Sequence, residues 1–173
     1  IFKMEGTVDM DGSAAFNFNR DRLVGLQGGF GTVQIGYFNT AYKNTTGKYD
    51  LFADRWGDIT GSGTHADFDR REANMIGYIN KFGNVKFAAD VNISEASDNT
   101  ATTARDENAM GYTVGVNVPV GPVEIAAAYG VRSGDSANEG DTGLKLGVQW
   151  KGPVQINFVY ENFEDEGDGV NTA

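Results

Sequence analysis

The feature that most constrains the fold of this chain is a repeated alternation of apolar residues with small or polar ones. The run TGLKLGVQW at residues 142–150 places Leu, Leu, Val and Trp on one face of an extended strand, and Gly, Lys, Gly and Gln on the other. The same two-residue period occurs in residues 84–93, 110–118, 123–132 and 153–161. No 3.6-residue helical period competes with it. The sequence therefore predicts an all-β fold.

The connections between these strands are of two kinds. Short connections with Gly or Gly-Pro turn signals occur at residues 28–29, 82–83, 119–122 and 151–153. Long polar connections occur at 7–16, 39–70, 95–108 and 133–141. We expect about nine strands, near residues 1–6, 18–27, 30–38, 71–81, 84–93, 109–118, 122–132, 142–151 and 153–162. An antiparallel meander with tight turns at one end and long loops at the other is typical of a transmembrane β-barrel.

A soluble β-sandwich or jelly roll also shows this alternation, so the two architectures must be compared. The non-apolar faces here are rich in Gly and Ala, whereas the solvent face of a sandwich usually carries Lys, Glu, Thr and Arg. Strands of about ten residues also exceed the globular mode of five to six and match the length that crosses a bilayer at a tilt. Both features favour the membrane barrel.

Composition excludes several classes of protein. The 173 residues include 14 Lys and Arg against 24 Asp and Glu, for a net charge of −10, which argues against a nucleic-acid partner. Cysteine is absent, which excludes thiol catalysis and Cys-based zinc sites. His65 stands alone in a polar segment, and no catalytic motif occurs in a valid setting. We therefore expect no enzymatic activity, no cofactor and no metal.

Nine strands cannot close a bacterial barrel, which has an even number, and unpaired strand edges are not stable in hydrocarbon. The sequence opens on Ile1 without an initiator Met or a signal peptide. We therefore expect residues 1–173 to form one incomplete domain, an internal portion of a larger barrel.

Two stretches carry a resemblance to a known family. RDRLVGLQGGFGTVQIGYFNT (residues 20–40) and RREANMIGY (residues 70–78) resemble strand motifs of the Gram-negative trimeric general porins. This resemblance implies a sixteen-stranded barrel that forms a homotrimer in the outer membrane, among its lipids and lipopolysaccharide. It implies passive diffusion of small hydrophilic solutes and ions. It also places residues 39–70 where the porins have a loop that folds into the lumen and narrows it.

In porins, basic side chains on the wall face carboxylates on that inserted loop. The resemblance transfers the wall arginines to Arg20 and Arg71, with Arg22 as a weaker addition. A further pore-facing arginine of the family is replaced here by Tyr37, which argues against strong anion selectivity.

On the loop side, Asp54 and Asp58 flank Trp56-Gly57, which stands where the porin loop has an aromatic-Gly pair. The acidic residue that precedes the aromatic in the family is Arg55 here, so we expect Asp54 and Asp58 to supply the negative side of the constriction. The net charge of −10 and the replacement of a pore arginine by Tyr37 predict a preference for cations.

Two other functions remain open on the sequence alone. A soluble β-sandwich could bind carbohydrate through Trp56 and the tyrosines. A plugged outer-membrane barrel could act as an adhesin or an enzyme through an external loop. The acidic run at residues 164–168 could bind calcium, although a solvated loop is the simpler interpretation.

Overall fold

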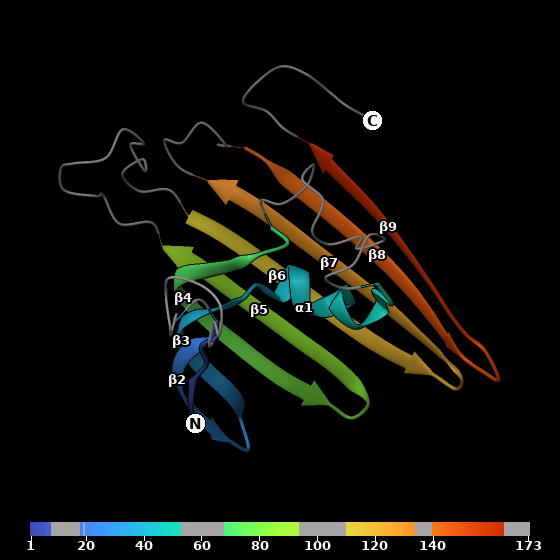
Figure 1. Ribbon diagram of the computed structural model, residues 1–173, viewed down its shortest axis with the longest axis horizontal. Coiled ribbons are helices and arrows are strands. Elements are labelled where there is room, and N and C mark those ends of the chain that lie inside the picture. The colour runs from blue at the N-terminus through green and yellow to red at the C-terminus, as the bar shows by residue number, and fades with distance from the viewer. Residues whose placement is uncertain (8–17, 19, 53–67, 94–109, 134–139, 165–173) are drawn as a thin grey trace.

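The computed structural model describes residues 1–7, 18, 20–52, 68–93, 110–133 and 140–164. Their main elements are nine strands (Figure 1): β1 (Phe2–Met4), β2 (Arg22–Gly28), β3 (Gly31–Asn39), β4 (Arg71–Phe82), β5 (Val85–Ile93), β6 (Met110–Val120), β7 (Val123–Ser133), β8 (Thr142–Lys151) and β9 (Gln155–Glu164). A short helix, α1 (Ala41–Thr46), and a 3-10 turn, η1 (Gly47–Tyr49), follow β3. None of the described helical segments is long and apolar enough to cross a membrane.

All nine strands form one sheet in sequence order, and every neighbouring pair is antiparallel. The tight turns after β2, β4, β6 and β8 lie at one end of the sheet, which we call the turn end (Figure 1). The opposite end, where the long connections begin and finish, is called the loop end. The prediction of an all-β antiparallel meander is confirmed. The main differences from the predicted ranges are β2, which begins at residue 22 instead of 18, and β1, which spans three residues instead of six.

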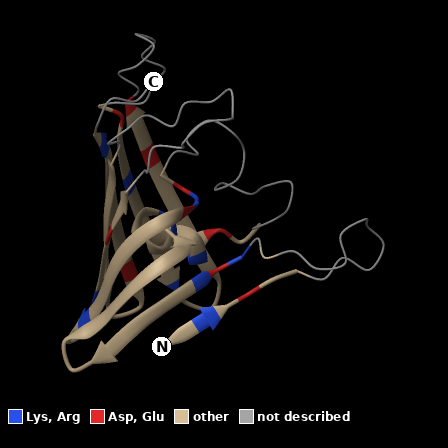
Figure 2. Cartoon of the chain, turned by 90° about the vertical axis from the view of Figure 1, so that its left-hand side faces the viewer, with Lys and Arg blue, Asp and Glu red and all other residues tan. Residues whose placement is uncertain are grey.

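The two faces of the sheet differ as the alternation predicts. One face carries apolar side chains that are largely exposed, including Leu26 at 74%, Val24 at 51% and Phe158 at 64%. The other face carries Gly, Ala and polar residues, most of which are buried between Gly111 and Gln149. The sheet is curved, and Figure 2 shows this curvature from the side. We call the Gly, Ala and polar face the inner face, because α1 lies against it (Figure 1).

The apolar face of the described sheet is not covered by a second layer of described residues. Its side chains therefore stay exposed instead of forming a core, and the buried aromatic residues gather on the inner face. Tyr42, Phe68 and Ala128 form that core, and the rings of Tyr42 and Phe68 lie 5.6 Å apart. This is the reverse of a sandwich, in which the apolar faces of two sheets pack together.

An irregularity in β3 leads the chain into α1. The pairing of β3 with β4 shifts between Gly36 and Phe38, and Gly36 has a φ of +139°. A Cβ at Gly36 would lie 2.2 Å from the carbonyl oxygen of Arg22, so a side chain does not fit there. Such bulges redirect a strand locally. Here the shift precedes Phe38, which is buried, and Thr40, which caps α1.

Candidate functional site

Residues 40–50 lie directly on the inner face of β5 to β8, where glycine allows a close approach. A Cβ at Gly115 would stand 1.8 Å from Thr45 Oγ1, and a Cβ at Gly147 would stand 2.6 Å from the Tyr49 ring. Helix α1 begins at Thr40, whose Oγ1 accepts a hydrogen bond from the Lys43 N–H at 3.1 Å and donates one to the Phe68 carbonyl at 2.5 Å. Residues 40–50 therefore pack directly against the small residues of the inner face.

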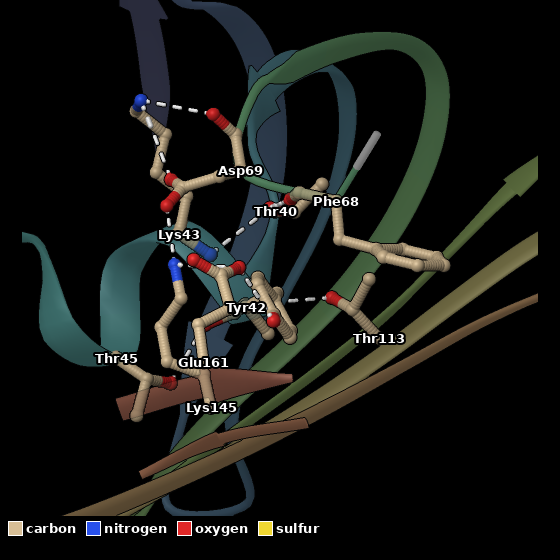
Figure 3. A network of polar contacts seen from close by, with 10 residues as sticks. Thr40, Tyr42, Lys43, Thr45, Phe68, Asp69, Thr113, Lys145 and Glu161 are labelled. Carbon is tan, nitrogen blue, oxygen red and sulfur yellow. Dashed lines mark hydrogen bonds and ion pairs between the residues drawn. The ribbon is translucent and has the colours of Figure 1, made fainter. Parts of the chain in front are cut away.

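A buried charge cluster fixes the middle of the segment to the wall (Figure 3). The Lys145 ammonium on β8 contacts the Asp69 carboxylate and lies 3.5 Å from Glu161 Oε1. Lys43 on α1 reaches the same Asp69, 3.5 Å from Oδ1 and 3.1 Å from its carbonyl oxygen. The Tyr42 hydroxyl donates to Glu161 Oε1 at 2.7 Å. Burial first, and then the Glu161 carboxylate, raise the pKa of Tyr42, so its hydroxyl stays protonated as a donor.

A second cluster surrounds Glu124, which projects from β7 and is buried. Its carboxylate contacts the Lys48 ammonium, accepts from the Tyr49 hydroxyl at 3.1 Å and lies 3.4 Å from Lys151 Nζ. Asn117 Nδ2 donates to it at 3.2 Å and to the Thr45 carbonyl at 2.9 Å. Glu124 therefore joins the end of the inserted segment to three strands of the wall. Burial raises the pKa of Tyr49 to about 12.

Two further carboxylates complete the attachment. Glu72 Oε1 pairs with Arg132 at 2.6 Å and with Arg70 at 2.7 Å, so it joins β4 to β7 near the loop end. Asp90 on β5 accepts from the Ala41 N–H at the start of α1 and from Thr113 Oγ1 at 2.8 Å. Buried charges are stable only when they are paired and hydrogen-bonded. The segment thus contacts the wall through paired charges and hydrogen bonds as well as through the rings of Tyr42 and Tyr49.

Comparison with known proteins decides which family this geometry belongs to. A family model described as Gram-negative porin matches residues 1–173. The chain belongs to the Gram-negative porin family. A search of curated proteins found no match.

A solved structure, the anion-selective porin from Comamonas acidovorans, is similar to this porin chain with a TM-score of 0.54 and 21% identity. The match covers 95% of this chain and 64% of that one. The likeness supports the barrel architecture that the alternation predicts. Because the chain belongs to the porin family, the alternative of a soluble carbohydrate-binding sandwich is wrong.

The arginines predicted for the pore wall of this porin are described in the structure. Arg71 Nε pairs with Asp21 Oδ1 at 2.7 Å, and Arg20 Nε lies 3.4 Å from Glu5 Oε1. The guanidinium of Arg22 lies 4.8 Å from the centre of the Tyr37 ring. Arg20, Arg22 and Arg71 thus lie near the loop end of β2 and β4.

The alternation of β2 shows on which face of the sheet Arg22 lies. Arg22 alternates with Leu23 and shares the exposed side of β2 with Val24 and Leu26, the apolar face. Arg71 is the first residue of β4 and pairs with Asn39, just before the irregular stretch in the pairing of β4 with β3. Burial acts to raise the pKa of Asp21, but Lys3 and Arg71 outweigh it and hold that pKa below its usual range. Asp54 and Asp58 lie outside the described residues.

Sequence reasoning did not identify the residues that hold the segment in place. Lys145 and Glu124 are the most important of these, and each carried a signal in the sequence. Lys145 is the one charged residue between Gly143 and Gly147 on its face, and Glu124 precedes Ala126 and Ala128 on its own. A charge among Gly and Ala on the inner face needs a partner from another layer. That requirement could have pointed to a segment lying on this wall.

Proposed function

We propose that the whole protein forms a water-filled channel in the outer membrane through which small hydrophilic solutes and ions diffuse passively. The observation that carries this proposal is the contrast between the faces of the sheet. One face exposes Val24, Leu26 and Phe158, which suits acyl chains, and the other holds a polar segment through charged pairs. Family membership supports the same function. This chain spans 64% of the length of the porin structure that it matches, so the proposal concerns the complete protein.

We propose further that the channel is a homotrimer, that lipids and lipopolysaccharide surround it, and that no enzymatic step accompanies passage. Residues 39–70 would narrow the lumen, with Arg20 and Arg71 on the wall side and Asp54 and Asp58 on the loop side. Arg22, the weaker candidate, shares the apolar face of β2 with Val24 and Leu26 and is therefore left out of the proposed wall. The contacts of residues 40–50 with β5 to β8 support a narrowing segment at this place.

We also propose a preference for cations, on the basis of where the charges lie. The described residues contain 12 Lys and Arg and 10 Asp and Glu, whereas the remaining residues contain 2 and 14. The excess of negative charge therefore belongs to the residues that adjoin the loop end of the strands in sequence. A negative mouth raises the local concentration of cations, most strongly at low salt. The anion selectivity of the Comamonas acidovorans porin describes that protein, and 21% identity does not transfer it.

The test uses the full-length protein, extracted in detergent and added to planar lipid bilayers. We expect stepwise, ohmic increases in conductance, together with an oligomer on electrophoresis that heating dissociates. In a gradient of KCl, the reversal potential should show preference for potassium, and this preference should weaken as salt rises. Absence of conductance steps would contradict the channel, and a chloride preference at low salt would contradict the selectivity alone.

A further inference from the structure

The turn end of the inner face carries an uncompensated positive charge. Lys81 on β4 and Lys86 on β5 are direct cross-strand partners in the hairpin, so both belong to the same face of the sheet. Lys86 is also the partner of Asn117 on β6, whose side chain contacts the inserted segment. Lys81 and Lys86 therefore lie on the inner face, and Lys86 stands next to Asn117, which contacts Thr45 of α1.

The charges near the tight turns can be counted completely, because every residue there is described. Residues 24–35, 78–89, 116–127 and 147–159 contain three lysines and one acid: Lys81, Lys86, Lys151 and Glu124. Lys48 joins them from η1 and contacts Glu124, as Lys151 does. Glu124 thus already contacts two ammonium groups. No ion pair within the described part of the chain involves Lys81 or Lys86.

This arrangement is costly without a counter-ion. Like charges directly opposite each other on neighbouring strands destabilise a sheet. Both lysines are exposed, so an anion from solution can reach them. The residues outside the described ranges adjoin the loop end of the strands in sequence, and they contain 14 acids and 2 bases, a balance that disfavours anions. An anion is consequently favoured at the turn end and disfavoured at the loop end.

We propose that Lys81 and Lys86, with Lys48 and Lys151 beside Glu124, form a docking site for doubly charged oxyanions at the turn-end mouth of the channel. The proposal depends on the proposed channel function for its location, since it places the site on a wall that borders water. Cations would gather at the loop-end mouth and oxyanions at the turn-end mouth. The channel would therefore respond differently to the same anion added from its two sides.

Inorganic phosphate is the probe, and the full-length protein in a planar bilayer is the sample. The orientation of each inserted channel is assigned by one-sided protease treatment. We expect phosphate added at the turn end to reduce chloride current at a lower concentration than phosphate added at the loop end. The double variant Lys81→Gln, Lys86→Gln should weaken this block by at least roughly fivefold per lysine, the factor that two unit charges about 4 Å apart contribute in water. Lys3→Gln makes the same change at the loop end and should leave the phosphate block unaltered.

A second readout does not depend on conductance. In a detergent without phosphate groups, the wild-type protein should broaden the phosphorus NMR line of inorganic phosphate, and the double variant should broaden it several-fold less. Equal block from both sides in a conducting channel, or an unchanged block and linewidth in the double variant, would overturn the docking site. Missing conductance together with lysine-dependent broadening would overturn the channel and retain the site.

Discussion

The Lys145 ammonium contacts the Asp69 carboxylate across 76 residues of sequence, and the two side chains are only 1% and 3% exposed. Lys145 belongs to the wall of the sheet, and Asp69 belongs to the segment that leads from the inserted stretch into β4. This pair therefore joins the two parts whose relative position defines the space along the inner face.

The first prediction concerns this pair. Lys145→Met should lower the free energy of unfolding by about 3–5 kcal/mol, because it leaves a buried carboxylate without its main partner. Adding Asp69→Leu should recover much of the loss, since neither buried charge then remains. Denaturant unfolding measures both. Lys86→Met, at an exposed lysine, serves as the matched control, and it should cause no loss and a gain of at most about 1 kcal/mol, because it relieves the repulsion from Lys81. If the double variant is as unstable as Lys145→Met alone, the pairing of Lys145 with Asp69 is contradicted.

The second prediction concerns the close approach of α1 to the wall. Gly115→Ala places a methyl group where Thr45 Oγ1 stands, so α1 must move away from β6. We expect a loss of about 1–3 kcal/mol in stability and noisier open-channel current, because overpacking shifts the inserted segment. Gly29→Ala is the control, since a Cβ there meets no atom within 4 Å. Identical current noise in Gly115→Ala and Gly29→Ala would contradict the position of α1.

The third prediction concerns pH. Burial raises the pKa of Tyr49 to about 12, whereas an unfolded tyrosine titrates near 10. Between these values the unfolded state binds fewer protons than the folded state, so stability falls as pH rises. The contribution of Tyr49 is complete below pH 10 and is lost as pH passes 12. Tyr49→Phe should flatten this decline in unfolding experiments and remove one late-titrating group from the absorbance titration. If stability falls equally steeply with pH in Tyr49→Phe, burial of the Tyr49 hydroxyl is contradicted.

The fourth prediction concerns selectivity. Glu124→Gln removes the carboxylate that pairs with Lys48 and Lys151, so the turn-end wall gains one net positive charge. We expect the reversal potential in a KCl gradient to move toward chloride, and to move further at low salt than at high salt. Glu164→Gln, which makes the same charge change at the loop-end tip of β9, should shift it less. A larger shift for Glu164→Gln would place the selective region elsewhere.

The strands were predictable from the sequence because their signal is local. Residues 142–151 match β8 at both ends, since alternation and a Gly-Pro turn define a strand without knowledge of its neighbours. The partners of Lys145 and Glu124 were not predictable, because they depend on how residues 40–50 lie across strands far away in sequence. The bulge between Gly36 and Phe38 was missed for a similar reason, since it exists only relative to the register of β4. Asp54 and Asp58 rest on the family resemblance alone.

The central claim is that the inner face borders water and the apolar face borders lipid, and Ala88 and Ala89 test it most directly. They are adjacent residues of β5 on opposite faces, and residues 1–173 contain no cysteine. In the full-length protein in lipid vesicles, Ala88→Cys should react with a hydrophilic thiol reagent and lose conductance on labelling. Ala89→Cys should react only with a lipid-soluble reagent and keep its conductance. Equal reaction of both cysteines with the hydrophilic reagent, or the reverse pattern, would contradict the account.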